Sequence, residues 1–310
     1  MTPPEKRKRV PVHGVLLLDK PAGISSAQAL AKAKWLLNAQ KAGHTGTLDP
    51  FATGLLPLCF GEATKFSQDL LDADKTYETT LVLGERTSTG DIEGDIVERK
   101  PVTVTRERLE SVLMQFVGAL QQVPPMHSAL KRDGKPLYEY ARAGITLQRE
   151  PRAVYIHTLE LLELAPPQLR LRVRCSKGTY VRVLGEDIGA ALGCGAHLGA
   201  LRRTAIGGLA MTHAVTLEQL AACPAEERGK YLQPVDTLLS SFPALVLDDA
   251  LARRFRQGQR IALERAGVSL PSASGRVRVY DAQAALVGTG QLLEGTLLAP
   301  ERLLADTASH

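Results

Sequence analysis

One short segment of the chain, residues 43–54, concentrates residue types that suit catalysis. It reads GHTGTLDPFATG and surrounds a single carboxylate, Asp49, with three glycines and three threonines. Glycines let a backbone turn tightly and approach a ligand closely, and Pro50 biases the backbone of the preceding Asp49 toward extended geometry. A carboxylate on a stiff loop of small residues suits a nucleophile or a general base. The alternative interpretation is a plain loop in which Asp49 caps the next element.

Four further segments accompany this loop in a fixed order. They are GVLLLDKPAGISS at residues 14–26, KTYETTLVLGERTSTGDIEG at 75–94, SKGTYVRVLGEDIG at 176–189 and LRRTAIG at 201–207. Together with the loop they resemble the motifs of the TruB family of tRNA pseudouridine synthases, and their order and spacing match that family from about residue 14 to the C-terminus. Five motifs in order are far more specific than any one of them. Within the first motif, Lys20 and Pro21 would support the Asp49 loop.

The resemblance implies an α+β fold divided into two domains. A pseudouridine synthase catalytic domain with a largely antiparallel mixed sheet would span residues 14–243, behind a basic N-terminal tail at residues 1–13. A small PUA-like β-barrel, which binds RNA in this family, would span residues 244–310. The C-terminal sequence itself favours a small barrel, because two short strands are expected at 277–280 and 285–289 around a turn.

The resemblance also implies which residues form the active site. Asp49 matches the catalytic nucleophile, and the matching substrate-binding residues are His44, Tyr77, Tyr180, Arg182 and Leu201. Arg182 would pair with Asp49, which orients the carboxylate and favours its ionised form. Tyr77 would stack on the target base. Judged by spacing alone, Tyr77 and Leu201 also suit a core position, and Arg182 reads as one more exposed arginine.

Pseudouridine formation needs one well-placed carboxylate and no redox step. The N1–C1′ bond of uridine breaks, the base turns and a C5–C1′ bond forms, so the nucleotide must first be flipped out of its stack. Asp49 would attack C1′, add to C6 of the base or abstract a sugar proton, and the sequence leaves these three routes open. No group donor is required, so no cofactor is expected. The seven histidines are scattered and the four cysteines lack zinc-binding spacing, so no metal site is expected.

Charge and hydropathy favour a soluble protein with a polyanionic partner. The chain has 310 residues and a net charge of +5, with a pI of about 9.0. Positive charge is concentrated at Lys6–Arg9, in Lys131–Arg152 and at Arg202 and Arg203, which favours contact with a phosphate backbone. No segment is apolar enough to span a membrane, no signal peptide is evident, and the unpaired cysteines favour a reducing compartment. With the resemblance, these features predict a cytoplasmic monomer that binds the T-arm of tRNA without an obligatory protein partner.

Local patterns predict the elements that carry these residues. Apolar residues from Leu109 to Val117 recur at helical spacing after a Thr105 cap and before Pro124, which predicts an amphipathic helix. Residues 169–175 alternate apolar side chains with arginines, which predicts a strand with one apolar and one cationic face. The basic, turn-rich residues 124–144 indicate an inserted segment. Further strands are predicted at 15–18, 55–60 and 76–83, a hairpin-like return at 89–95, and helices after Ser25–Ser26, over 180–192 and near 251–255.

Three alternative functions fit parts of the sequence. The catalytic subunit of a guide-RNA-dependent ribonucleoprotein would share the fold, but it is expected to carry longer lysine-rich ends than residues 306–310 here. An RNA-binding protein with a dead site would not need Asp49, Tyr77 and Arg182 together. A phosphohydrolase with an aspartyl nucleophile would need Mg²⁺ and further carboxylates. Activity on bare tRNA, without guide RNA and in the presence of a chelator, separates all three from the TruB function.

Overall fold

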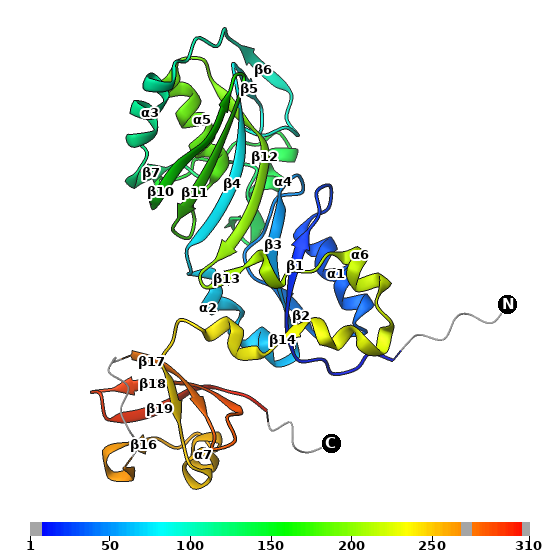
Figure 1. Ribbon diagram of the computed structural model, residues 1–310, viewed down its shortest axis with the longest axis vertical. Helices are drawn as coiled ribbons and strands as arrows, with labels where there is room; N and C mark the ends of the chain where they lie inside the picture. The colour runs from blue at the N-terminus through cyan, green and yellow to red at the C-terminus, as the bar shows by residue number, and fades with distance from the viewer. Residues whose placement is uncertain (1–7, 268–274, 306–310) are drawn as a thin grey trace, which may run out of the picture.

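The computed structural model describes residues 8–267 and 275–305. Two members of the basic cluster, Lys6 and Arg7, and the C-terminal residues 306–310 lie outside the described residues. The described chain is elongated, with a large sheet at one end and a small sheet at the other (Figure 1). Each sheet contains one parallel strand pair and is otherwise antiparallel, and helices pack against both. The predicted α+β fold is confirmed.

The large sheet has ten strands, in the order β14-β1-β3-β12-β4-β11-β10-β7, with β13 paired to β12 and β2 paired to β3. Its central strands are β1 (Gly14–Lys20), β3 (Thr53–Phe60), β12 (Ala196–Ile206), β4 (Lys75–Leu83) and β11 (Gln168–Cys175). The others are β2 (Ala42–His44), β7 (Gly118–Gln122), β10 (Arg152–Ala165), β13 (Leu209–Ala210) and β14 (Leu232–Gln233). The strands predicted at 15–18, 55–60, 76–83 and 169–175 are confirmed.

Four helices pack against the large sheet. They are α1 (Ser26–Leu36) and α6 (Leu217–Ala222) beside β1, and α3 (Arg106–Met114) and α5 (Val181–Leu192) beside β10 and β12 (Figure 1). Glycine lets α5 pack closely, because a Cβ atom added at Gly185 would lie 2.5 Å from side-chain atoms of both Leu81 and Leu198. This contact fixes α5, which carries Arg182, against β4, which carries Tyr77.

The helix predicted over residues 109–117 is too long, and the strand that follows it was not expected. The helix α3 begins after a Thr105 cap, as predicted, but it ends at Met114. Gly118 has a φ of +103°, a conformation that other residues rarely adopt. Strand β7 then pairs with β10 at the edge of the sheet. Long-range pairing therefore decided the conformation of a segment whose local pattern favours a helix.

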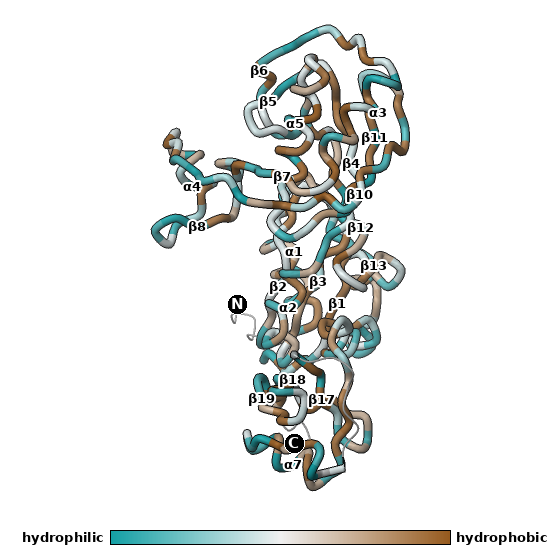
Figure 2. Tube along the Cα trace, turned by 90° about the vertical axis from the view of Figure 1, so that its left-hand side faces the viewer, coloured by the Kyte–Doolittle hydropathy of each residue, from teal (hydrophilic) through white to brown (hydrophobic). Residues whose placement is uncertain are grey.

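Two short hairpins extend from the large sheet. Strands β5 (Glu85–Thr87) and β6 (Ile96–Arg99) form the predicted hairpin-like return. Within residues 124–144, strands β8 (Lys131–Arg132) and β9 (Lys135–Pro136) form the second hairpin, and α4 (Leu137–Arg142) follows it. Figure 2 shows this second group projecting from the body of the molecule, as expected for an inserted segment.

The small sheet has five strands in the order β15-β17-β18-β19-β16 and curls into a half-barrel. The strands are β15 (Ala244–Val246), β16 (Ile261–Ala262), β17 (Gly275–Tyr280), β18 (Leu286–Leu293) and β19 (Leu297–Leu303). Together with α7 (Asp249–Arg256), the sheet encloses a separate core that includes Phe255 and Val277. The strands predicted at 277–280 and 285–289 are confirmed, and the domain boundary at residue 244 stays a prediction.

The structure also shows the state of the cysteines and the character of the helices. All four cysteines, Cys59, Cys175, Cys194 and Cys223, are free and buried, as expected for thiols without a pairing pattern. Within residues 8–267 and 275–305, no helix is long and apolar enough to cross a membrane.

Candidate active site

The loop that carries Asp49 is held on both sides of this residue by buried polar side chains. Ser26 Oγ accepts a hydrogen bond from the Leu48 amide at 2.8 Å and donates one to the Leu48 carbonyl at 3.0 Å. On the other side, Lys20 Nζ donates to the Pro50 carbonyl at 3.2 Å. Lys20 and Ser26 are almost completely buried. The first motif therefore supports the loop through Lys20, as expected, and also through Ser26.

Arg182 lies beside Asp49 and joins it to a second carboxylate. Its Nη2 atom lies 3.1 Å from Asp49 Oδ2, and its Nη1 atom lies 3.3 Å from Asp91 Oδ2. The guanidinium also donates to the backbone carbonyls of Thr89 and His127. The Arg182 side chain is 5% exposed, whereas that of Asp49 is 36% exposed. The interpretation of Arg182 as one more exposed arginine is therefore wrong, and Asp49 is the member of the pair that a ligand can reach.

Asp91 is a site residue that the sequence analysis did not single out. It is 3% exposed, and its Oδ1 atom accepts from Thr89 Oγ1 at 2.6 Å and from the Glu93 amide at 3.1 Å. The only signal in the sequence was a Thr-Gly-Asp turn, which is common in hairpins. Within residues 8–267 and 275–305, no group of three or more His, Cys, Asp or Glu side chains is arranged to hold a metal ion.

The charges around Asp49 act on its pKa in opposite directions. Burial raises the pKa of Asp49 most strongly, the Arg182 charge lowers it, and the Asp91 charge raises it again, with a net rise above the ordinary value. Arg182 thus favours the ionised form, as expected, but burial outweighs it. Burial also lowers the pKa of Lys20 to about 8, against the opposing charges of Asp49 and Glu93. The ionised form of Asp49 is therefore lost at a higher pH than that of an exposed aspartate.

Tyr77 and Leu201 lie on the two neighbouring strands β4 and β12. In their register, Tyr77 is opposite Arg203, and Leu201 is opposite Thr79. Leu201 is 8% exposed, and the partly buried Tyr77 packs against the main hydrophobic core. Burial raises the pKa of Tyr77, the nearby Arg203 charge lowers it, and the Asp49 charge adds to the rise. Tyr77 therefore belongs to the core and also lies near the Asp49 carboxylate.

Tyr180 and His44 are positioned by strands at opposite sides of the site. The Tyr180 amide donates to Gln122 Oε1 at 3.0 Å, and Gln122 Nε2 donates to the Tyr180 carbonyl at 3.3 Å. Gln122 ends β7, so the strand that the sequence did not reveal fixes Tyr180 at the start of α5. His44 ends β2, and burial together with the Arg203 charge lowers its pKa, which favours a neutral imidazole. Its buried Nδ1 atom has no hydrogen-bond partner among the described residues.

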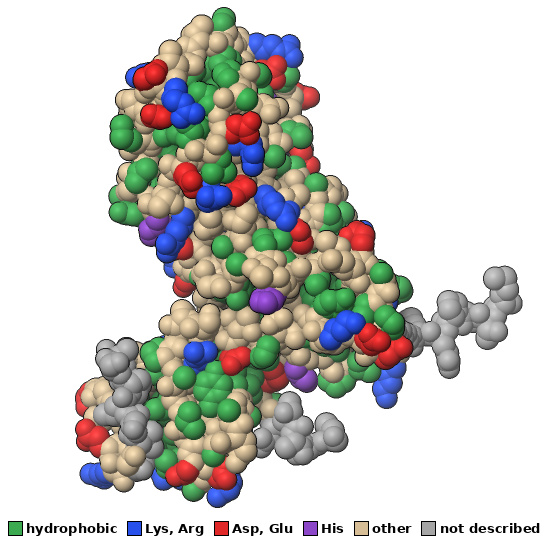
Figure 3. Space-filling view, viewed as in Figure 1, with side chains coloured by type: hydrophobic (Ala, Val, Ile, Leu, Met, Phe, Trp, Pro, Cys, Tyr) green, Lys and Arg blue, Asp and Glu red, His purple; other side chains and the backbone are tan. Residues whose placement is uncertain are grey.

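Two predicted concentrations of positive charge are not open cationic surfaces. Arg203 is only 1% exposed, and Arg202 pairs with Asp19 at 2.7 Å. The face of β11 expected to be cationic carries a row of ion pairs, because its arginines contact carboxylates of β4, β10 and Asp74. Figure 3 shows positive and negative side chains intermixed on the viewed face of the large sheet. The two-faced pattern predicted for residues 169–175 is confirmed, because the apolar side chains of β11 are buried and its arginines lie on the outer face, where they are ion-paired.

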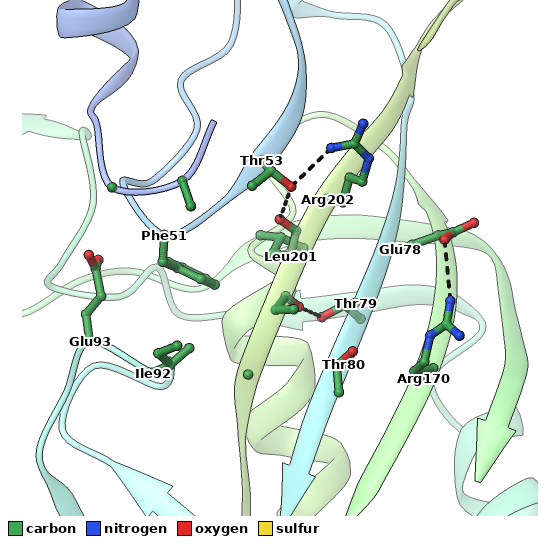
Figure 4. A pocket seen from close by; sticks show the side chains of 14 residues that line it. Phe51, Thr53, Glu78, Thr79, Thr80, Ile92, Glu93, Arg170, Leu201 and Arg202 are labelled. Carbon is green, nitrogen blue, oxygen red and sulfur yellow. Dashed lines mark hydrogen bonds and ion pairs between the residues drawn. The ribbon is translucent and has the colours of Figure 1, made fainter. Parts of the chain in front are cut away.

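A cavity of about 620 Å³ lies next to the Asp49 loop. Phe51 and Thr53 line it from the loop side, Thr79 from β4 and Leu201 from β12. Figure 4 shows the Phe51 ring pointing toward β12. Of the predicted site residues only Leu201 lines this cavity, while Asp49 precedes Phe51 by two residues and faces Arg182. The cavity therefore adjoins the Asp49 loop without enclosing the Asp49 carboxylate.

Comparison with known protein families gives three consecutive matches. Residues 34–181 match the model described as TruB family pseudouridylate synthase (N terminal domain). Residues 182–240 match the tRNA pseudouridylate synthase B C-terminal domain, and residues 243–304 match the C-terminal domain of pseudouridine synthase II TruB.

Individual proteins resemble the chain over almost its full length. A Burkholderia mallei protein named tRNA pseudouridine synthase B is 58% identical over 309 residues, covering 99% of both chains. A Ralstonia pickettii protein of the same name is 58% identical over 313 residues, covering 97% of both chains. Among solved structures, a Cbf5–Nop10–Gar1 complex matches with a TM-score of 0.73 and 27% identity, covering 98% of this chain and 91% of that chain.

Proposed function

The chain belongs to the TruB family of pseudouridine synthases, and we propose that its reaction is the conversion of uridine 55 in the T-loop of tRNA to pseudouridine. Its full-length relatives carry names that specify tRNA pseudouridine synthesis. Proteins read RNA sequence mainly in loops whose bases can be splayed out. A T-loop uridine can be flipped toward Asp49 at a cost of roughly a few kcal/mol.

Asp49 is the proposed reacting group. Its side chain is 36% exposed beside a buried Arg182, so an incoming nucleotide meets the carboxylate before the guanidinium. In the reaction the N1–C1′ bond breaks and a C5–C1′ bond forms, the C5 hydrogen leaves to solvent and N1 gains a proton. Asp49 attacks C1′, adds to C6 or removes a sugar proton, and each route uses its ionised form. Because atoms and electrons balance without an oxidant or group donor, the proposed reaction needs no cofactor.

The other predicted site residues bind and orient the nucleotide in this proposal. Arg182 orients Asp49, which its burial and its four oxygen partners support. Tyr77 stacks on the flipped base, and a neutral His44 occupies the space that the base leaves. Tyr180 and Leu201 line the uridine pocket. Their positions around a single loop support these roles, because they come from four separate segments of the sequence.

The observation that carries the proposal is that the buried Arg182 joins the accessible Asp49 to the buried Asp91. A phosphohydrolase would direct its carboxylates toward a common metal ion, whereas here both carboxylates contact one guanidinium. The test is tritium release from a T-arm RNA that carries 5-tritiated uridine. The parent protein should release tritium with a chelator present, and Asp49→Asn should be slower by more than about 10³-fold while binding the RNA normally. No release by the parent, or substantial release by Asp49→Asn, excludes the proposal.

The proposed enzyme acts on bare tRNA as a cytoplasmic monomer, without a guide RNA or a protein partner. Two of the similar solved structures contain Cbf5 in complexes with other proteins, so action as a single chain needs its own measurement. A purified single chain should modify an unmodified tRNA transcript, and substitution of the T-loop uridine should abolish the product. A requirement for added RNA or protein would instead assign a ribonucleoprotein role.

A further inference from the structure

Arg203 carries a positive charge inside the protein without a counterion. It is the largest side chain that the described part of the chain buries almost completely, with 1% of its surface exposed. No carboxylate within residues 8–267 and 275–305 lies at ion-pair distance from it. A buried, unpaired charge is costly, so its hydrogen bonds must compensate.

Those hydrogen bonds go to the two ends of the catalytic loop. Arg203 Nη2 donates to the Gly46 carbonyl at 2.8 Å, and Arg203 Nε donates to the Leu55 carbonyl at 2.8 Å. Gly46 and Leu55 bracket Asp49 in the sequence. One guanidinium therefore sets the distance between the strand that enters the loop and the strand that leaves it.

Two glycines of the loop leave the space that Arg203 occupies. Gly46 has a φ of +66°, and a Cβ atom there would lie 3.3 Å from Arg203 Nη1. Gly54 has a φ of +98°, and a Cβ atom there would lie 2.2 Å from the Arg203 carbonyl oxygen. Larger residues at positions 46 and 54 would therefore collide with Arg203.

Arg203 also acts on two predicted substrate-binding residues. Arg203 on β12 lies opposite Tyr77 on β4, and its charge lowers the pKa of Tyr77 against the effect of burial. Its charge also lowers the pKa of His44. A cation beside a phenol favours the ionised phenolate, so the Tyr77 hydroxyl releases a proton more readily than burial alone allows.

We infer that Arg203 is a positioning residue of the active site, which holds the Asp49 loop in a fixed arrangement and places a positive charge opposite Tyr77. The inference rests on the proposed function. It assigns to Arg203 an effect on the chemical step, through the geometry of Asp49 and the protonation of Tyr77, rather than on RNA affinity.

Two variants separate the charge of Arg203 from its hydrogen bonds. Arg203→Lys keeps the charge with a single ammonium, and Arg203→Gln keeps a donor without the charge. Both should lower the single-turnover rate at saturating tRNA by roughly 10²-fold, the scale expected for a loop displaced by about 1 Å, with tRNA affinity little changed. In Arg203→Gln the limb of the pH profile that Tyr77→Phe removes should also shift to higher pH, because the phenol loses its neighbouring cation.

Arg228 provides a matched control. It donates to the carbonyls of Leu36, Cys223 and Ala221. Like Arg203 it is bonded to backbone oxygens, but none of these acceptors belongs to the Asp49 loop. Arg228→Lys should lower the melting temperature and leave the single-turnover rate and its pH dependence unchanged. A second readout uses the Tyr77→Phe variant, which lacks the phenol hydroxyl. In this variant Arg203→Gln should no longer change the pH dependence of the single-turnover rate.

Each outcome decides the inference. If the parent protein has no turnover, the proposed function fails, which is distinct from failure of this inference. If the parent is active and both Arg203 variants fold with a normal rate and pH profile, Arg203 has no positioning role. If the Arg203 and Arg228 variants lose rate only in proportion to lost folded protein, or if neither Arg203 variant folds, Arg203 is a structural residue and the inference is overturned.

Discussion

The two ends of the molecule use arginine in opposite ways. Near Asp49, Arg182 and Arg203 are 4% and 1% exposed, and protein oxygen atoms accept from both guanidinium groups. In the C-terminal half-barrel, Arg253 and Arg254 lie exposed on α7. A buried arginine with several partners fixes geometry, because it cannot move without breaking several bonds. An exposed arginine offers charge to a partner whose phosphates vary in position.

The C-terminal arginines themselves are not all equivalent. Arg253, Arg254 and Arg260 are exposed, whereas Arg256 pairs with the buried Asp281 at 2.8 Å. Four arginines lie close together near the start of this region, and the three exposed ones are the proposed phosphate contacts. The comparison predicts that substitutions near Asp49 change the reaction rate and that substitutions on the half-barrel change tRNA affinity.

The largest effect is expected for Arg182→Lys. An ammonium group cannot contact Asp49, Asp91 and two carbonyls with the planar geometry of a guanidinium. The single-turnover rate at saturating tRNA should fall by at least about 10²-fold, with affinity nearly unchanged. Arg253→Lys, at an exposed position, is the control and should match the parent in both measurements. A normal rate for Arg182→Lys would remove the distinction between the two regions.

Substitution of Tyr77 tests whether the site also contributes to binding. If its ring stacks on the flipped base, Tyr77→Leu should weaken RNA binding by about 1–3 kcal/mol, whereas Tyr77→Phe should bind like the parent. Fluorescence titration of both variants with T-arm RNA measures this. Equal affinity and equal turnover for the parent, Phe and Leu proteins would leave Tyr77 with its core role alone.

A smaller effect is expected for the exposed arginines of the half-barrel. Replacing Arg253, Arg254 and Arg260 together with Gln should weaken tRNA binding and lower the slope of log affinity against log salt by about 2–3. The single-turnover rate at saturating tRNA should not change.

The matched control for this prediction removes three positive charges from β11. Arg170, Arg172 and Arg174 are ion-paired with protein carboxylates, so replacing them with Gln should leave the salt slope near that of the parent. If both triple variants changed the slope equally, net charge alone would explain the binding, and the half-barrel would have no special role.

The smallest expected effect is a shift in the pH dependence of the single-turnover rate, caused by a substitution of Asp91. The Asp91 charge raises the pKa of Asp49, so Asp91→Asn should lower that pKa and keep Asp49 ionised to a lower pH. The acidic limb of the single-turnover pH profile should therefore move to lower pH. Asp281→Asn, at the ion pair of the half-barrel, should leave the limb in place. A shift of the Asp91→Asn limb to higher pH would contradict the assigned electrostatics.

The sequence predicted well those features that depend on neighbouring residues. The Asp49 loop was recognisable because its glycines, threonines and proline restrict the same short backbone segment. The helix cap at Thr105 and the alternation along 76–83 are likewise local, and the structure confirms both. By contrast, β7 was missed, because its conformation depends on pairing with β10 rather than on its own pattern.

The motifs and their order thus predicted the α+β class through the family resemblance, local patterns predicted most strands, and both singled out Asp49 as the candidate reactive carboxylate. Only the tertiary structure decided which charged residues are buried. Arg203 lies 157 residues from its acceptor Gly46, and in the sequence it looks the same as its partly exposed neighbour Arg202. A buried charge is stable only where distant segments bring enough oxygen atoms around it, and no local pattern records that convergence. For the same reason, Asp91 was visible in the sequence only as part of a turn.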